Sequence, residues 1–245
     1  MYLHIAKTAE EFNHSIADWM VQCVVDTLKI QNRFTLVLSG GNTPKGLYEL
    51  LSASPYREKI DWRKMHIFWG DERDVPFSDD RNNAKMAYET LLNHVPIPVS
   101  QIHMMQTENI TPEKSASAYE KILKQYFPTS DSEFQTFDLV LLGMGDDGHT
   151  LSLFPGTTIV HEEHAWAKAY YLEAQKMYRI TLTKAIVNKS KHIAFLTTGN
   201  NKAHALKEVL EGQYNPDLYP SQEIKPENGE LHWFVDEAAT TQLNH

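Results

Sequence analysis

Short apolar runs that alternate with helical patterns constrain the fold of this chain more than any other feature. The segments LVL, LVLL and IAFL are continuously apolar, as strands buried on both faces of a sheet are. Strand–helix alternation predicts an α/β fold of Rossmann-like type, with a mostly parallel sheet and helices on both faces. The candidate strands are Arg33–Ser39, Met65–Trp69, Phe137–Leu142, Tyr178–Thr183, His192–Thr198 and Leu231–Val235.

Helix boundary signals occupy the segments between these runs. Thr8 and Glu11 form a capping box, and Thr111 precedes a proline at the first helical position of another helix. A third helix is predicted from Asn200 to Glu211, ending at Gly212. The 245 residues contain no repeat and no long linker, so we expect one α/β domain spanning residues 1–245.

Composition excludes several classes of protein. The net charge of −9 argues against general binding of nucleic acid or anionic lipid. No apolar stretch approaches the roughly 20 residues that a membrane helix needs, and the N-terminus lacks the pattern of a secretory signal. Cys23 is the single cysteine, so no intramolecular disulfide is possible. We therefore expect a cytoplasmic protein that contacts neither membranes nor nucleic acid.

In parallel sheets, ligands bind beyond the carboxyl ends of the strands, and the first such end is followed by a glycine-rich turn. Two glycines there allow close approach of a ligand, and either Asn42 or Thr43 can cap the helix that follows. Free N–H groups at a helix N-terminus suit a phosphate. A plain strand–turn–helix connection explains the segment equally well. The candidate phosphate-binding residues are Ser39, Gly40, Gly41, Asn42 and Thr43.

A charged cluster follows the second strand. Asp71, Glu72 and Arg73 come directly after the aromatic segment MHIFW and one glycine. Charge runs are commonly solvated surface loops. Carboxylates beside an arginine at a strand's carboxyl end also describe an acid/base site with a clamp for a planar anion.

The segment GMGDDGH after the third strand is the most informative motif. It matches the GxGxxG dinucleotide pattern formally, but two aspartates would face the pyrophosphate and a proline follows too soon for the long helix. We interpret it instead as a turn, including Gly145, that presents His149. A lone histidine is more often structural, but one after a glycine-rich turn at a buried strand's end is a good candidate base.

Two cations complete the candidate site. Arg179 begins the segment RITLT, and Lys202 follows Gly199 after a buried strand. A lysine in the first turn of a helix opposes the helix dipole, which favours a role toward a ligand, although a solvated lysine explains it too. The sequence lacks a Walker A motif, a GxSxG elbow and the histidine spacing of zincins. We therefore expect no metal and no covalent nucleophile.

Taken in order, these motifs resemble the 6-phosphogluconolactonase family. The matching segments are LVLSGGNTPKGLYELL, IFWGDERDVP, FDLVLLGMGDDGHTLSLFPG, RITLT, LTTGNNKAHALKEVLEG and GELHWFVDEAA. The resemblance implies the fold shared with glucosamine-6-phosphate deaminases and ribose-5-phosphate isomerases. It also implies hydrolysis of 6-phosphogluconolactone in the oxidative pentose phosphate pathway, without a cofactor.

The deaminase branch of this superfamily is the nearest alternative. Deaminases continue after the DGH motif with an apolar-Asn-Glu-Pro stretch, whereas Thr150-Leu151-Ser152 follows here. Arg73 also stands where deaminases carry an aromatic residue, so both differences favour the lactonase. Two positions depart from the lactonase pattern, namely Asn42 in place of serine and Asp146 in place of proline. A sugar-phosphate-binding regulator without activity is a further alternative.

The resemblance and the motifs together give a mechanistic hypothesis. His149 takes a proton from water, with Asp71 or Glu72 orienting the imidazole or the water, and Arg73 stabilises the oxyanion or holds substrate. The phosphate rests on the turn 39–43, assisted by Arg179 and Lys202. The sequence leaves the oligomeric state open between a monomer and a weak homodimer.

Overall fold

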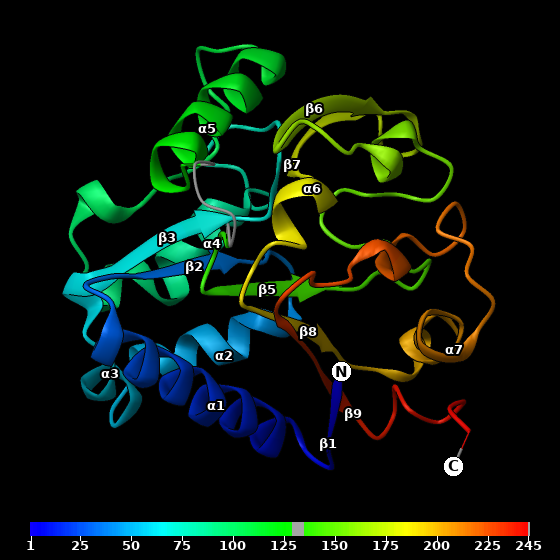
Figure 1. Cartoon of the computed structure of the whole chain (residues 1–245), viewed down its shortest axis with the longest axis horizontal. Helices are drawn as coiled ribbons and strands as arrows, with labels where there is room; N and C mark the ends of the chain where they lie inside the picture. The colour runs from blue at the N-terminus through cyan, green and yellow to red at the C-terminus, as the bar shows by residue number, and fades with distance from the viewer. Residues whose placement is uncertain (129–134, 245) are drawn as a thin grey trace.

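The computed structural model describes residues 1–128 and 135–244, which form two sheets and the helices that pack on them (Figure 1). The larger sheet has six strands in the order β1-β9-β8-β5-β2-β3, and every pairing in it is parallel. Its strands are β1 (Tyr2–Ala6), β2 (Phe34–Leu38), β3 (Met65–Trp69), β5 (Leu139–Gly143), β8 (His192–Thr197) and β9 (Glu230–Asp236). The predicted Rossmann-like fold class is confirmed.

The helices cover both faces of this sheet because alternate residues of each central strand face opposite ways. Leu36 and Leu38 of β2 pack into one apolar core, whereas Val37 packs into the other. In Figure 1, α1 and α2 lie below the sheet and α5 above it. The helices are α1 (Ala9–Ile30), α2 (Thr43–Ser52), α3 (Tyr56–Lys59), α4 (Asn83–Thr90), α5 (Pro112–Tyr126), α6 (Lys184–Val187) and α7 (Ala203–Glu211).

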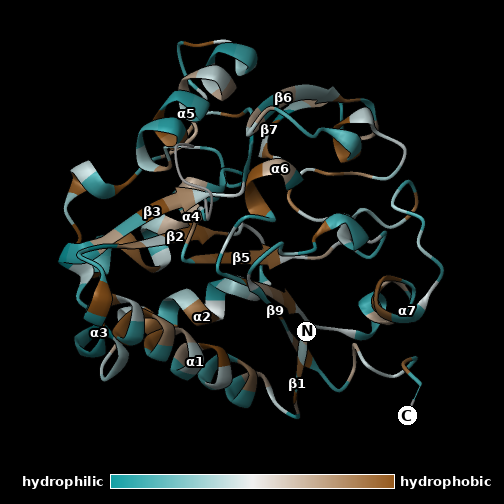
Figure 2. Ribbon diagram, in the orientation of Figure 1, coloured by the Kyte–Doolittle hydropathy of each residue, from teal (hydrophilic) through white to brown (hydrophobic). Residues whose placement is uncertain are grey.

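Helix ends follow the local signals of the sequence. The Thr8 side chain accepts a hydrogen bond from the Glu11 backbone N–H at the start of α1, and Thr111 caps α5 in the same way. Gly212 ends α7, although the predicted helix begins with a short 3₁₀ turn at Asn200–Lys202. Figure 2 shows apolar residues concentrated on the central strands and polar ones on the outer faces of helices. Within the described residues, no helix combines the length and apolarity needed to cross a membrane.

A second, antiparallel sheet was not predicted. It has three strands in the order β4-β7-β6, with β4 at Asp71–Arg73, β6 at Ala167–Leu172 and β7 at Met177–Leu182. The segment predicted as Tyr178–Thr183 is therefore a strand, but it belongs to this smaller sheet. Sequence patterns missed β4 because its three residues are all charged. They missed β1 because it is largely exposed, and β6 because its burial follows no regular alternation.

The smaller sheet continues from the carboxyl end of the larger one through Gly70. The Gly70 N–H donates to the Leu38 carbonyl at 3.0 Å, and the Gly70 carbonyl accepts from the Leu182 N–H at 2.8 Å. This glycine therefore joins the end of β2 to the end of β7. The arrangement brings the charged β4 strand over the edge of the sheet where the turns after β2 and β5 emerge.

Candidate functional site

A cavity of about 430 Å³ lies at the carboxyl ends of the parallel strands. It collects residues from the turns after β2, β5 and β8 and from the smaller sheet. Every site residue predicted from the sequence lines it except Glu72. The predicted residues around it are Ser39, Gly40, Gly41, Asn42, Thr43, Asp71, Arg73, Gly145, His149, Arg179 and Lys202.

His149 stands at one wall of the cavity, held by an aspartate two residues earlier. Nδ1 of His149 lies 2.6 Å from Oδ1 of Asp147, and the same oxygen accepts the His149 backbone N–H at 3.0 Å. Because a carboxylate only accepts, Nδ1 carries the proton and Nε2 keeps its lone pair. The Phe154 ring stacks on the imidazole with centroids 4.0 Å apart. This geometry fixes both the tautomer and the plane of the ring.

The partner of the imidazole is therefore a correction to the sequence hypothesis, which named Asp71 or Glu72. Burial raises the pKa of Asp147, but its hydrogen bond to His149 and the imidazole charge outweigh burial and lower it overall. The sequence carried a local signal for this pair, because an aspartate side chain commonly accepts a hydrogen bond from the backbone N–H two residues further along the chain. Gly145 permits the pair, because a Cβ there would overlap Nδ1 of His149. Asp146, the unusual residue of this turn, is exposed and does not line the cavity.

Glu72 points away from the cavity because side chains alternate along a strand, so Glu72 and its neighbours in β4 face opposite ways. Its carboxylate accepts the backbone N–H groups of Arg73, Asn83 and Ala84 at 2.8–2.9 Å, the last two at the start of α4. Burial raises the pKa of Glu72 to about 7, against the opposing effect of these donors. The structure thus places the Glu72 carboxylate at the start of α4 and not in the lining of the cavity.

Asp71 and Arg179 form a buried ion pair at the cavity wall. Nη2 of Arg179 lies 2.5 Å from Oδ2 of Asp71, and the Ser152 hydroxyl donates to the same oxygen at 2.6 Å. Burial raises the pKa of Asp71, but the Arg179 and Arg73 guanidinium charges and these hydrogen bonds lower it overall. Each side chain is therefore already engaged in an ion pair with the other, and no sequence pattern predicted this pairing.

Arg73 is positioned by Asn83, a residue that sequence reasoning missed. Nη1 of Arg73 donates to the Asn83 side-chain oxygen and to the Arg81 carbonyl, the latter at 3.2 Å. The Asn83 amide also donates to the Asp71 carbonyl at 2.9 Å. Gly40 lies against this amide, because a Cβ at that position would overlap the Asn83 side chain. No pattern in the sequence links Asn83 to the strand that precedes it by about ten residues.

The turn after β2 leads into α2, whose first N–H groups face the cavity. Asn42 occupies the N-cap position, but neither it nor another side chain makes the predicted cap hydrogen bond there. Thr43 instead lies 3.2 Å from the Thr198 hydroxyl. Pro44 has no N–H and the Lys45 N–H donates to the Asn42 carbonyl at 3.2 Å, so the Thr43 N–H is the first-turn donor that remains for an anionic ligand. Lys202 also lines the cavity, and no ion pair to it is found among residues 1–128 and 135–244.

Comparisons with known proteins identify the family of this chain. The family model described as glucosamine-6-phosphate isomerases/6-phosphogluconolactonase matches residues 7–233. A 6-phosphogluconolactonase of Synechocystis sp. is 41% identical over 209 residues, covering 85% of this chain and 84% of that protein. One from Haemophilus influenzae is 38% identical over 206 residues, covering 84% of this chain and 86% of that protein.

A solved structure of a relative has the same fold. The 6-phosphogluconolactonase of Trypanosoma brucei superposes with a TM-score of 0.87 at 27% identity, covering 99% of this chain and 98% of the other. The family match spans both the turn after β2 and the turn that carries His149. The chain belongs to the glucosamine-6-phosphate isomerase/6-phosphogluconolactonase family.

Proposed function

We propose that this chain hydrolyses 6-phosphoglucono-1,5-lactone to 6-phosphogluconate, using His149 as a general base toward water. The observation that carries the proposal is the cavity that joins an oriented imidazole to three cationic side chains. A lactone is an activated ester, so its opening needs a base and a place for the developing oxyanion. The relatives named above are lactonases at about 40% identity over most of the chain, which supports the same substrate.

His149 has the orientation that proton transfer requires. With Nδ1 bonded to Asp147, Nε2 is the atom that takes the proton as water attacks the lactone carbonyl carbon. The carbonyl π electrons move to oxygen, giving a tetrahedral oxyanion. When that intermediate collapses, the bond from carbon to the ring oxygen breaks, and the imidazolium returns its proton to that oxygen. Asp147 stabilises the imidazolium that exists between the two steps.

Arg73 is the group placed to stabilise the oxyanion. Its Nη1 is held by Asn83 and by the Arg81 carbonyl, which fixes the guanidinium at the cavity wall. Within the described chain, the other guanidinium N–H groups of Arg73 have no hydrogen-bond partner. A guanidinium fixed in advance stabilises developing charge without reorganising during the reaction.

The substrate phosphate is assigned to the start of α2 and to Lys202. The start of α2 offers the Thr43 N–H and the positive end of the helix dipole. Lys202 adds a full charge to the lining of the same cavity. Arg179 contributes to the positive potential, but its guanidinium is bound to Asp71, so it is a weaker phosphate ligand than the sequence suggested.

The local charge explains how an acidic protein attracts an anionic substrate. The chain has a net charge of −9, whereas Arg73, Arg179 and Lys202 face a single carboxylate, Asp71, around the cavity. Such a cavity concentrates anions despite the overall field.

The test measures opening of 6-phosphogluconolactone generated in the assay, against its spontaneous hydrolysis. We expect acceleration that His149→Ala reduces by about 10²–10⁴-fold, the usual contribution of a positioned general base. No acceleration by folded wild-type protein would refute the proposal. Release of ammonia from glucosamine 6-phosphate, measured in parallel, would identify a deaminase, and tight binding without turnover would identify a regulator.

A further inference from the structure

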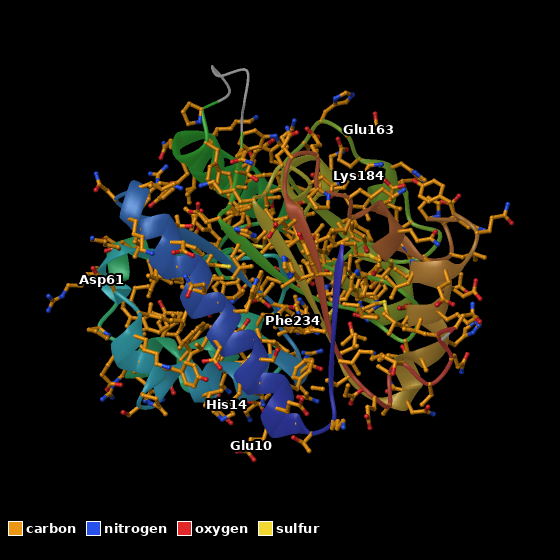
Figure 3. All side chains as sticks on the ribbon, turned by 60° about the horizontal axis from the view of Figure 1, so that its bottom comes forward. Glu10, His14, Asp61, Glu163, Lys184 and Phe234 are labelled. Carbon is orange, nitrogen blue, oxygen red and sulfur yellow. The ribbon has the colours of Figure 1, made fainter. Side chains whose placement is uncertain are left out.

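A second cluster of chemically active side chains lies at the other end of the large sheet. His192 and Glu230 begin the neighbouring strands β8 and β9 and pair in register, and His232 lies two residues along β9. Because residues two apart share a face of a strand, all three side chains project from the same face. This is the face covered by α1, and in Figure 3 that helix passes beside the labelled Phe234 of β9.

The distances within the cluster match those between ligands of one ion. Nδ1 of His192 and Nε2 of His232 each lie 3.3 Å from the same oxygen, Oε2 of Glu230. The three atoms all lie within 4.8 Å of one another. Ligands about 2.0–2.2 Å from a tetrahedral ion are separated by about 3.3–3.6 Å. The two measured separations fall on such tetrahedron edges.

His192 supplies an independent indication. Its Nδ1 is buried and has no hydrogen-bond partner among the described residues, although the Glu230 oxygen is within reach. A buried nitrogen left without a partner is costly unless something else satisfies it. A shared metal ion would accept the lone pair that the carboxylate cannot.

The surrounding residues hold these ligands in place through hydrogen bonds. Nε2 of His4 lies 3.1 Å from Nδ1 of His232, so Nε2 of His232 is the ring nitrogen that faces Glu230. The Tyr2 hydroxyl donates to the other oxygen of Glu230 at 3.4 Å. Partners of this kind fix the tautomer and orientation of metal ligands.

We infer that His192, Glu230 and His232 form a zinc-binding site, separate from the cavity at the carboxyl ends of the strands. Two imidazoles and one carboxylate are a ligand set that Zn²⁺ prefers, with water in the fourth position. The Glu230 side chain is 47% exposed, so the ion reaches the site from solvent. The zinc site lies about 16 Å from the carboxyl end of β8, because β8 rises about 3.3 Å per residue over the five steps from His192 to Thr197. The ion would therefore cross-link β8 and β9 without taking part in the reaction.

The experiment is calorimetric titration of tag-free full-length protein with zinc chloride at neutral pH, followed by Co²⁺ titration with visible absorption spectra. Glu230→Gln is the main variant because it removes the charge at an exposed position. His161→Ala is the matched control, since His161 and Asp217 form another histidine–carboxylate pair at 2.7 Å, to which the described part of the chain adds no third ligand. His4→Phe retains the ring stacked on Phe234 at 4.3 Å and removes the hydrogen bond to His232.

We expect one Zn²⁺ per wild-type chain and per His161→Ala chain, with intense Co²⁺ bands of a tetrahedral site. His4→Phe should weaken binding by about 10–100-fold, the usual effect of losing a hydrogen bond to a metal ligand, and Glu230→Gln by at least as much. Absence of stoichiometric zinc binding by the wild type would overturn the assignment. Equal affinity of wild type and Glu230→Gln would do so as well. Retained lactone hydrolysis by Glu230→Gln shows that the variant is folded.

Discussion

The proposed mechanism is tested most directly by a substitution in the pair formed by Asp147 and His149. Asp147→Asn removes the carboxylate charge while conserving the size of the side chain. In the wild type, one carboxylate oxygen receives both the Nδ1–H and the backbone N–H of His149. The variant weakens the bond that fixes the tautomer and loses the charge that stabilises the imidazolium. We expect the loss mainly in kcat, because substrate binding does not involve Asp147.

The size of the effect follows from the structure. A hydrogen bond to a charged group contributes about 1.5–3 kcal/mol. The Asp147 side chain is 44% exposed, and solvent screening reduces this to about 1–2 kcal/mol. At about 1.4 kcal/mol per factor of ten, the variant should lose about 5- to 30-fold in kcat/KM. His149→Ala should lose about 10²–10⁴-fold, since it removes the base itself.

A double-mutant cycle in the lactone-opening assay separates a positioning role from a catalytic one. If Asp147 acts only through His149, the double variant should be no slower than His149→Ala. Asp146→Asn is the matched control, because it removes the same charge one residue away at an exposed position. It should change kcat/KM by less than about twofold. Losses that add in the double variant, or equal losses in both asparagine variants, would refute the reasoning.

Three further predictions concern the same cavity. Lys202→Ala should raise KM by about 5- to 30-fold with kcat nearly unchanged, because it removes one charged contact to phosphate worth about 1–2 kcal/mol. Steady-state kinetics check this, and a pure kcat loss would place Lys202 at the reacting carbon. Glu72→Gln should lower the free energy of unfolding in urea by about 1–3 kcal/mol, because the new amide places an N–H group against the Ala84 N–H. The value of kcat should stay unchanged, and a loss of kcat without a loss of stability would restore Glu72 as a catalytic group. The lowered pKa of Asp71 stabilises the fold above the ordinary aspartate pKa of about 4, and this contribution is lost as pH falls through the lower folded-state pKa. The stability difference between wild type and Asp71→Asn, measured by urea unfolding across acidic pH, should therefore shrink as pH falls, and a constant difference would contradict the prediction.

The sequence by itself determined the fold class and most of the polar residues that surround the cavity. Continuous apolar runs can be buried on both faces, and such strands require a parallel sheet between helix layers. The residues that follow strands of a parallel sheet then meet at one edge. For this reason His149, the turn 39–43 and Lys202, which come from distant parts of the chain, were all found without coordinates.

Only the tertiary structure decided which of these residues touch one another. Either Asp71 or Glu72 was expected to orient the imidazole or the water, but the unrecognised strand β4 turns Glu72 away from its neighbours and toward the start of α4. Arg179 was expected to hold phosphate, but the pairing of β4 with β7 places its guanidinium on Asp71.

The physical reason is that composition and periodicity report burial and direction along one segment, whereas contacts depend on the register between segments. A hydrogen bond between residues two apart, such as Asp147 and His149, leaves a local signal. The contact of Arg73 with Asn83 and the cluster of His192 with Glu230 leave none, because the fold alone brings those side chains together.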